Sequence, residues 1–312
     1  MSGKIYDLII LGGGPAGLSA VIYARRANLD VLLIERGALG GQITQTAEIE
    51  NYPGGIKGES GLEFVTRLSG HASSFGYESV SDEISGVDIA GEVKVLTGEK
   101  GVYKGRALVI ATGNVPMKLG VPGEAEFTGR GVSYCATCDA PFFSGLEVYV
   151  VGGGDSAVEE SLHLAKFARH VTVIHRRDQL RAAKSIQAKA EAAGNVSYLL
   201  DSVISEIRGG DLLESIVVKN VKTGETHEIS ANKEDMTMGV FIFIGNEPQT
   251  GMFSDKLDME NGYIITDENM LTGLPGVFAA GDVRRKPLRQ VVTAAADGAI
   301  AAFQAERYLS EA

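Results

Sequence analysis

The chain has 312 residues, of which 44% are hydrophobic and 22% are charged, a composition typical of a globular protein with about two domains. Its 29 basic and 40 acidic residues give a net charge of −11, which argues against nucleic acid or an anionic membrane as the main partner. The longest uncharged run, 8–24, is short for a membrane span and is interrupted by glycines, and Asp7 before it is unlike the start of a signal peptide. We therefore expect a cytoplasmic protein with no membrane segment.

An internal duplication predicts the fold. Residues 7–36 and 147–176 align without a gap, and each segment reads as an apolar strand, a glycine-rich turn, an amphipathic helix and a second apolar strand. Strand–helix–strand units of this kind form parallel sheets. The sequence therefore predicts an α/β fold with two Rossmann-like dinucleotide-binding domains.

The two glycine-rich turns are expected to bind the pyrophosphates of dinucleotides. Gly12 permits a tight turn, Gly14 lets a pyrophosphate approach the backbone, and Gly17 or its counterpart Ala157 lets the helix pack against the strand. The alternative, two turns that bind nothing, is disfavoured because both copies carry the full strand–turn–helix–strand context. The binding residues predicted here are Gly12, Gly13, Gly14, Pro15, Ala16 and Gly17 in the first copy, and Gly152, Gly154, Asp155, Ser156 and Ala157 in the second.

The two copies differ at the position that normally meets the adenosine ribose. In the first copy this residue is Glu35, whose carboxylate can accept a hydrogen bond from a free 2′-hydroxyl and would repel a 2′-phosphate. In the second copy it is His175, followed by Arg176, Arg177 and Arg181, and guanidinium groups suit a 2′-phosphate. The alternative for these arginines is a solvated helix start. We expect a nucleotide without a 2′-phosphate in the first site and NADPH in the second.

The only cysteines, Cys135 and Cys138, form a single C-x-x-C motif. Such a pair can be redox-active, half of a zinc site or a coincidence. A zinc site needs two further ligands, and the chain has no second C-x-x-C and no closely spaced histidine pair; coincidence is disfavoured because the pair uses every cysteine of the chain. A redox pair and no metal are therefore predicted. Asp139 adjoins the pair and could exchange a proton with it, although it could instead merely stabilise the start of a helix.

The remaining segments predict one domain inserted in another. Strands ending in glycine motifs are expected at 107–116 and 276–283, and an Ala-rich helix from near Gln290 to Leu309. Polar, strand-like stretches at 78–103 and 197–228 are each expected to form a small antiparallel layer over their own nucleotide fold. The first domain would comprise 1–114 and 246–312, and the inserted domain would comprise 115–245.

An ordered series of short motifs resembles the low-molecular-weight thioredoxin reductases, which are flavoproteins with two dinucleotide-binding domains. It covers essentially the whole chain. The motifs are GGGPAG at Gly12–Gly17, GGQ at Gly40–Gln42, ENYPG at Glu50–Gly54, ATG at Ala111–Gly113, CATCD at Cys135–Asp139, GGGDSA at Gly152–Ala157, HRRDQLRA at His175–Ala182, GDV at Gly281–Val283 and RQ at Arg289–Gln290.

The resemblance implies that the chain is a homodimeric thioredoxin-disulfide reductase with FAD in the first site. Electrons would pass from NADPH through FAD to the cysteine pair and then to thioredoxin or a thioredoxin-like protein. Cys138 would face the flavin, Cys135 would attack the partner disulfide, and one domain would rotate against the other. Besides the first turn, the implied FAD residues are Glu35, Gly41, Gln42, Asn51, Thr112, Asp282, Arg289, Gln290 and Val291.

Two segments depart from the family pattern. Pro141 stands where the family often has an aromatic residue, and Phe142 and Phe143 after it could dock a partner or could belong to the core. The basic run at 284–287 is expected to be a solvated loop, and no role is assigned to it.

Related activities remain as alternatives. The flavoprotein of alkyl hydroperoxide reduction would need a further dithiol domain before the strand expected near Ile5, a ferredoxin–NADP reductase would lack the C-x-x-C, and a flavin-dependent dithiol oxidase would lack the arginine cluster. A reductase of a different disulfide partner, or a redox-sensing flavoprotein that does not turn over, is a further alternative.

Overall fold

The computed structural model describes residues 3–46, 49 and 51–311, and the chain folds into two compact units. The first unit comprises Met1–Thr44, Glu48–Val115 and Glu247–Ala312, and the second comprises Pro116–Asn246 with the short segment Gln45–Ala47. The two connections between them carry β7 (Asn114–Pro116) and β16 (Asn246–Pro248), which pair as a two-stranded sheet.

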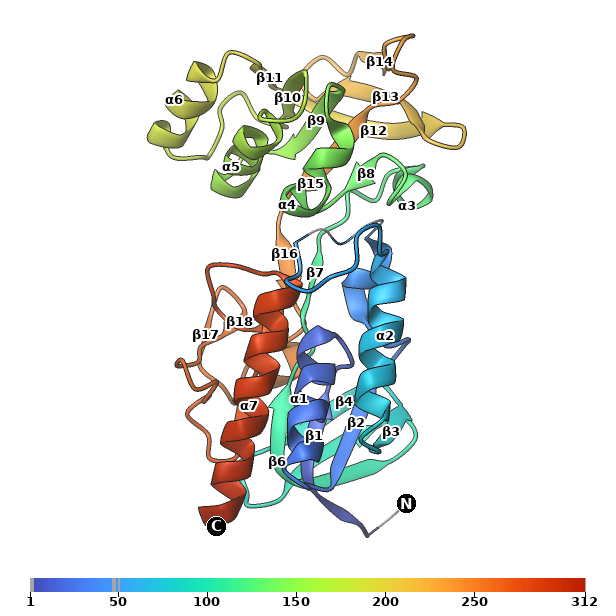
Figure 1. Cartoon of the computed structure of the whole chain (residues 1–312). Coiled ribbons are helices and arrows are strands. Elements are labelled where there is room, and N and C mark those ends of the chain that lie inside the picture. The colour runs from blue at the N-terminus through green and yellow to red at the C-terminus, as the bar shows by residue number, and fades with distance from the viewer. Residues whose placement is uncertain (1–2, 47–48, 50, 312) are drawn as a thin grey trace. The chain divides into compact units, whose positions relative to one another are not determined.

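A seven-stranded sheet forms the centre of the first unit (Figure 1). Its order is β3-β2-β1-β6-β5-β4, and β19 also pairs with β6. The pairs of β5 with β4 and β6 are antiparallel, and the other pairs are parallel. The bounds are β1 (Ile5–Leu11), β2 (Val31–Glu35), β3 (Glu78–Ser81), β4 (Ile84–Asp88), β5 (Lys94–Gly98), β6 (Val102–Ile110) and β19 (Val277–Ala279).

The predicted antiparallel layer at 78–103 was wrong in part. Its first strand, β3, pairs parallel with β2, and β4 and β5 extend the same sheet. The reason is α2 (Gly61–Ser73), a helix that the sequence reading did not identify and that provides the crossover between two parallel strands. Ser60 and Glu63 form a capping box at its start, and Glu59 just before it forms a salt bridge with Arg67.

The sheet of the first unit is covered on both faces. Leu8 and Ile10 of β1 point into a core that includes α1 (Pro15–Arg26) and α7 (Val291–Glu311), which lie side by side in Figure 1. Ile9 and Leu11 alternate to the other face. That face packs against residues of β4, β5 and the segment 251–283, which contains η3 (Gly251–Phe253), β17 (Met259–Glu260), β18 (Tyr263–Ile264) and η4 (Gly281–Val283). The Ala-rich helix expected from near Gln290 is confirmed.

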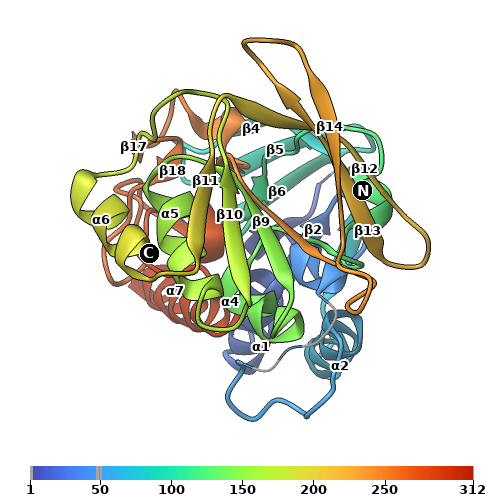
Figure 2. The same ribbon diagram turned by 90° about the horizontal axis from the view of Figure 1, so that it is seen from above.

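The second unit has a five-stranded sheet in the order β11-β10-β9-β15-β8, and all its pairs are parallel. Figure 2 shows β9, β10 and β11 side by side. An antiparallel sheet of β12, β13 and β14 packs on one face of this sheet, and α4 and α5 pack on the other. The strands are β8 (Val132–Ser133), β9 (Glu147–Gly152), β10 (His170–Ile174), β11 (Val196–Leu199), β12 (Ser202–Gly209), β13 (Leu213–Asn220), β14 (Thr226–Ser230) and β15 (Gly239–Phe243). The helices are α3 (Glu124–Phe127), α4 (Ala136–Asp139), η2 (Ala140–Phe143), α5 (Asp155–Leu164) and α6 (Lys184–Ala192).

The duplication read from the sequence is confirmed in space. β1, α1 and β2 in the first unit correspond to β9, α5 and β10 in the second, and each strand pair is parallel. The predicted antiparallel layer of the second unit is present as β12–β14, although the residues that precede it form β11 of the parallel sheet. No helix among the described residues is long and apolar enough to cross a bilayer.

Candidate active site

The first glycine-rich turn joins β1 to α1. Gly12 has φ +109°, and a Cβ there would lie 2.3 Å from the Ala111 carbonyl oxygen. A Cβ on Gly17 would lie 1.8 Å from the Gly12 carbonyl oxygen, so the helix packs directly on the turn. At Gly14, the N-cap of α1, the nearest atom to such a Cβ would be 3.9 Å away, and no side chain caps the helix. The turn thus combines tight internal packing with an open face of backbone amides, which suits a pyrophosphate.

Glu35, the last residue of β2, is held across this turn. Its Oε2 accepts a hydrogen bond of 2.7 Å from the Gly13 amide, and its Oε1 accepts one of 3.0 Å from the Gly37 amide. Each carboxylate oxygen keeps a further lone pair. Glu35 is therefore fixed in place and can still accept hydrogen bonds from ribose hydroxyls.

Two neighbouring segments carry further predicted FAD residues. The Gly40 amide donates to the first turn at 2.8 Å, which places η1 (Gly41–Gln45) beside it. Gln42 Nε2 donates to the backbone carbonyl and to the side-chain oxygen of Asn114, the latter at 3.2 Å. Thr112 Oγ1 donates to the Gln249 carbonyl at 2.7 Å. These contacts join η1 to the glycine turn and to Asn114, and join the segment after β6 to Gln249.

The basic run at 284–287 is not a solvated loop, and that expectation was wrong for two of its three cations. Arg284 Nη1 lies 3.0 Å from Oδ1 of Asp297, and Lys286 Nζ lies 2.9 Å from Oδ2 of the same carboxylate. Asp297 Oδ2 also accepts from the Gly281 amide at 3.1 Å. All three charged side chains are buried where α7 packs against η4, so each needs its partner. The cluster fixes η4, which contains Asp282, to α7.

Asp282 lies beside this cluster. Burial raises the pKa of its carboxyl, although Lys286, with Nζ 3.7 Å from Oδ1, and Arg289 act in the opposite direction. Within residues 3–46, 49 and 51–311, that Oδ1 is buried and has no hydrogen-bond partner. A buried acceptor without a donor calls for an explanation, and a hydroxyl group of a bound cofactor would supply the donor.

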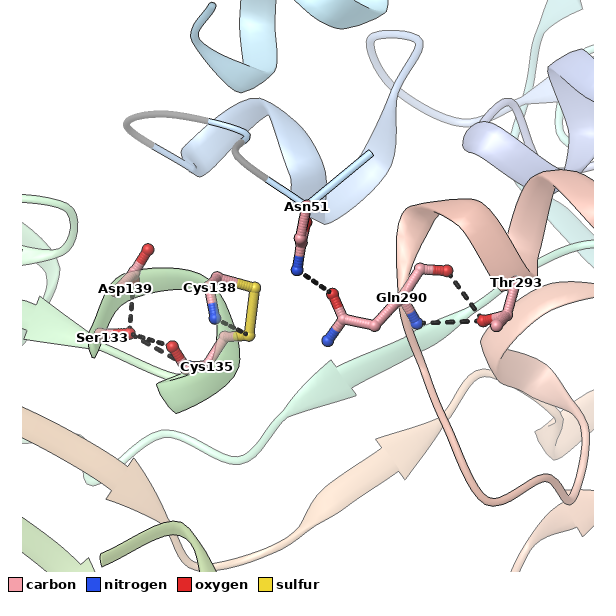
Figure 3. Close-up of a disulfide and its surroundings, with 7 residues drawn as sticks. All are labelled: Asn51, Ser133, Cys135, Cys138, Asp139, Gln290 and Thr293. Carbon is pink, nitrogen blue, oxygen red and sulfur yellow. Dashed lines mark hydrogen bonds between the residues drawn. A yellow bond between two sulfur atoms is a disulfide. The ribbon is translucent and has the colours of Figure 1, made fainter. Parts of the chain in front are cut away.

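The segment that leads into α7 carries the last predicted FAD residues. The Arg289 guanidinium lies 4.0 Å from the centre of the Tyr263 ring, and its buried Nε has no partner in the described part of the chain. Gln290 Oε1 accepts a hydrogen bond of 3.0 Å from Asn51 Nδ2 (Figure 3). Val291 is the first residue of α7. Residues far apart in the sequence are thus brought to the start of one helix.

The residues of the first unit fit FAD. The open face at Gly14, the anchored carboxylate of Glu35 and the unpartnered atoms of Asp282 and Arg289 provide the donors and acceptors that a dinucleotide requires. Glu50, the first residue of the ENYPG motif, lies outside the described residues.

The second glycine-rich turn repeats this arrangement in the second unit. Gly154 is the N-cap of α5 and no side chain caps the helix, while Ser156 in the first turn is exposed. A Cβ on Gly152 would lie 2.5 Å from the Cβ of Ala157, so this helix also packs closely on its strand. The free amides at the start of α5 suit a second pyrophosphate.

A loop rich in arginine is fixed to this turn. The Arg181 amide donates to the Gly153 carbonyl at 2.7 Å, and Asp155 Oδ1 accepts a hydrogen bond of 2.7 Å from the amide of residue 183. The Asp155 side chain therefore holds the arginine-rich loop in place. The side chains of Arg176, Arg177 and Arg181 are exposed, and none of them forms a salt bridge with a carboxylate of the described residues. Exposed guanidinium groups without counter-ions beside a pyrophosphate site fit the 2′-phosphate of NADPH.

His175 differs from the three arginines because it is buried beneath the turn. A Cβ on Gly153 would lie 2.2 Å from its Nδ1. Burial lowers the pKa of His175, and the neighbouring arginines lower it further, so the ring is neutral near pH 7. Its Nε2 is buried with no partner among the described residues. His175 thus adds a polar atom to the site and no positive charge.

The two cysteines are joined as a disulfide at the start of α4 (Figure 3). Cys135 is the N-cap residue, and its Sγ accepts a hydrogen bond of 3.2 Å from the Cys138 amide. In the reduced protein this donor would favour the Cys135 thiolate over the thiol. Both cysteines are partly exposed, which thiol–disulfide exchange requires.

Asp139 is the last residue of α4, which is a single turn, so its carboxyl also lies in the first turn of that helix. Burial raises the pKa of its carboxyl. Its Oδ2 accepts a hydrogen bond of 2.6 Å from Ser133 Oγ, and its Oδ1 is buried with no hydrogen-bond partner in the described part of the chain. A buried carboxyl with a raised pKa and one free oxygen, adjacent to Cys138, is suited to proton transfer.

The two phenylalanines after Pro141 have different environments. Phe143 packs edge-on against Phe241, with 5.0 Å between the ring centres, and contributes to the core. Phe142 is exposed. The core interpretation therefore holds for Phe143, while Phe142 remains available to a partner.

The sequence reading missed several residues that support the site. Asp297 could have been noticed as a lone charge in the apolar first turns of an Ala-rich helix, and Ser133 as a hydroxyl two residues before the C-x-x-C. Asn114 and Tyr263 gave no local signal, because their roles depend on contacts with Gln42 and Arg289.

Comparisons with known proteins agree with this geometry. The family model for pyridine nucleotide-disulphide oxidoreductases matches residues 6–298. The thioredoxin reductase of Peptoclostridium acidaminophilum is 54% identical over 98% of both chains. The thioredoxin reductase of Bacillus subtilis is 46% identical over 99% of this chain and 96% of its own length. The crystal structure of thioredoxin reductase from Streptococcus pyogenes is 45% identical, covers 100% of both chains and matches with a TM-score of 0.93.

Proposed function

Because this chain belongs to the thioredoxin reductases, within the pyridine nucleotide-disulphide oxidoreductase family, we propose that it reduces the disulfide of thioredoxin with electrons from NADPH. The observation that carries the proposal is the Cys135–Cys138 disulfide next to a buried carboxyl, in a unit that also carries the arginine-rich nucleotide site.

We assign the first unit to FAD and the second unit to NADPH and the dithiol. The support for FAD in the first unit is its anchored Glu35 and the unpartnered polar atoms of Asp282 and Arg289. The support for NADPH in the second unit is the set of three exposed arginines that form no salt bridge with the described residues. The domain boundaries, 1–114 with 246–312 and 115–245, and the individual binding residues are part of this proposal.

When bound, FAD accepts the hydride of NADPH and delivers an electron pair to the disulfide. Two electrons break the S–S bond and leave two sulfur anions, so protons must follow. The Asp139 carboxyl gives its proton to one sulfur and becomes a carboxylate. The Cys138 amide stabilises the remaining charge on Cys135.

The dithiol then reduces the partner. The Cys135 thiolate attacks one sulfur of the partner disulfide and forms a mixed disulfide, and the displaced partner sulfur takes a proton from water. Cys138 loses its proton to the Asp139 carboxylate and attacks Cys135, which re-forms the Cys135–Cys138 bond and releases the second partner sulfur. The carboxyl is protonated again, and electrons and protons balance over the cycle.

The dithiol and the NADPH site belong to the same unit, yet both must reach a flavin held by the other. Reaction requires an approach of about 3–3.5 Å, and one ring face cannot accommodate both. We therefore infer that the two units change their arrangement during turnover, with the paired connections β7 and β16 as the hinge. A cross-link that locks the units should stop turnover, and full activity of the locked protein would refute this step.

Oxidation of NADPH with an oxidised thioredoxin present tests the function. The wild type should consume NADPH in proportion to the thioredoxin reduced. Cys138→Ser should keep its FAD and lose this activity, whereas Thr137→Ser, an exposed change between the two cysteines, should behave as the wild type. A purified protein that binds no FAD, or turnover that survives in Cys138→Ser, would refute the proposal.

We further propose a cytoplasmic homodimer. The cytoplasm maintains the reducing conditions in which a thioredoxin system operates. The first unit exposes large apolar side chains on neighbouring helices, Tyr23 on α1 and Val292 and Phe303 on α7, which an interface between two copies would cover. Light scattering on the purified holoenzyme tests this state, and a monomer at micromolar concentration would refute it.

A further inference from the structure

Ser133 joins the two parts of the dithiol site through one buried hydroxyl. Its Oγ donates a hydrogen bond of 2.6 Å to Asp139 Oδ2 and accepts one of 3.1 Å from the Cys135 amide (Figure 3). The Cys135 carbonyl lies 3.4 Å from the same Oγ, as a second possible acceptor. Ser133 is buried at the end of β8, so the parallel sheet of the second unit fixes its position.

A serine hydroxyl can serve both protonation states of its neighbour. The group has one proton to donate and two lone pairs that accept. When Asp139 is ionised, the Ser133 proton points to Oδ2 and one lone pair accepts from the Cys135 amide. When Asp139 is protonated on Oδ1, the oxygen that exchanges its proton with sulfur, Oδ2 is the carbonyl oxygen of the acid and still accepts the Ser133 proton, while Oγ still accepts from the Cys135 amide. The same three groups therefore stay satisfied throughout a proton transfer.

We propose that Ser133 is the positioning residue for proton transfer in the dithiol site, because its hydroxyl fixes the Asp139 carboxyl to the backbone of Cys135 in both protonation states. This inference rests on the proposed proton-transfer role of Asp139. Ser133 does not itself give or take the transferred proton. It holds one carboxyl oxygen and leaves the other, Oδ1, free to exchange a proton with sulfur.

The surroundings leave Ser133 as the dominant polar influence on Asp139. Burial raises the pKa of this carboxyl, and the Ser133 hydrogen bond acts against burial. α4 packs against η2, which has no titratable side chain, against α5, and against a face of the parallel sheet whose core residues there, Val148, Val150 and Phe241, are apolar. The titratable groups of α5 are Asp155, Glu159, Glu160 and His163.

The test compares Ser133→Ala with Ser133→Thr, which keeps the hydroxyl, and with Asp139→Asn. Ser144→Ala is the matched control, because it deletes an exposed hydroxyl of the same unit that bonds to a backbone carbonyl. The first measurement is an infrared pH titration of the oxidised holoenzyme, in which the protonated Asp139 carboxyl is assigned by the loss of its band in Asp139→Asn. The second is the pH dependence of dithiol reduction by NADPH, followed by rapid mixing.

Ser133→Ala should raise the midpoint of the carboxyl band by about one pH unit, since a hydrogen bond to a charged group alters such an equilibrium about tenfold. Dithiol reduction needs the protonated carboxyl, so the fall in its rate with rising pH should move upward by the same amount. The rate at low pH should drop about tenfold, because the carboxyl is no longer held in place. Ser133→Thr should restore both values, and Ser144→Ala should leave both unchanged.

The proton-transfer role of Asp139 and the positioning role of Ser133 can be refuted separately. If Asp139→Asn reduces its dithiol at the wild-type rate, the proton-transfer role fails, and the Ser133 inference fails with it. If Asp139→Asn is slowed about 100-fold or more while Ser133→Ala keeps the wild-type midpoint, the inference about Ser133 alone is overturned. A lower melting temperature with an unshifted midpoint would make Ser133 merely structural, which also overturns it. The infrared titration needs only folded protein, so a slow variant still gives a decisive result.

Discussion

The buried cluster around Asp297 gives the sharpest prediction about stability. Asp297→Asn keeps the shape of the side chain but removes the negative charge that faces two buried cations. Arg284 and Lys286 lie 3.0 and 2.9 Å from its oxygens, and the three side chains are at most 10% exposed. The variant therefore leaves buried positive charge without its main counter-ion.

The expected loss is at the lower end of the range for a broken buried ion pair, about 3 kcal/mol. It is not larger because Arg284 keeps hydrogen bonds of 2.7 Å to Thr266 Oγ1 and 3.1 Å to the Asp267 carbonyl, and Lys286 keeps Asp282 at 3.7 Å. At roughly 2–4 °C per kcal/mol, the melting temperature should fall by about 6–12 °C.

Thermal unfolding followed by circular dichroism, with FAD removed, measures this effect without the stabilisation that a ligand adds. Asp255→Asn is the control, because Asp255 pairs with Lys256 at the surface, where the loss of an ion pair should leave the melting temperature almost unchanged. Adding Lys286→Met to Asp297→Asn should recover part of the loss, since a buried ammonium then no longer needs a partner. If Asp297→Asn melts within 1 °C of the wild type, the cluster does not stabilise the fold and the reasoning is wrong.

Three further variants test the first glycine turn, the arginine loop and the start of α2. Gly17→Ala should abolish FAD retention, because the new Cβ would lie 1.8 Å from the Gly12 carbonyl oxygen. Gly70→Ala is the control on α2, where the new methyl group meets open space and should stabilise the protein by about 0.5–1 kcal/mol. Bound flavin and the free energy of unfolding are measured for both variants, and a Gly17→Ala protein with full flavin would refute the packing argument. Replacing Arg176 and Arg177 by Gln should lower the preference for NADPH over NADH in kcat/KM by about tenfold or more, and an unchanged ratio would remove them from the phosphate site. Glu59→Gln should lower the free energy of unfolding by about 1–2 kcal/mol at pH 7, because the salt bridge to Arg67 of α2 stabilises the ionised Glu59 and lowers its pKa. The difference in stability between variant and wild type should disappear as the pH falls through that lowered pKa, since the wild-type carboxyl is then protonated. A difference that does not change with pH would contradict the role of this salt bridge.

The family, the fold class and the position of each reactive group along the chain could be predicted from local sequence patterns. The duplicated strand–turn–helix–strand pattern predicted both parallel sheets, because the features that specify such a unit are local: a hydrophobic period, a glycine turn and a helix start. The redox pair of Cys135 and Cys138 could also be predicted from the sequence, because two thiols three residues apart need only one turn of backbone to meet. The resemblance to thioredoxin reductases is confirmed by relatives of 54% and 46% identity over nearly the full chain.

Which polar groups meet across long separations in the sequence depends on how the elements pack, and local patterns do not predict it. Nothing near Asn51 in the sequence indicates Gln290, and nothing near Arg284 indicates Asp297, because these pairs form when distant elements pack against the same sheet. Burial likewise turned an apparently solvated basic run into an ion-pair cluster, since a charge has a fixed partner only where water is excluded. The hydroxyl of Ser133 became part of the dithiol site in the same way, because β8 carries it to the carboxyl that α4 presents.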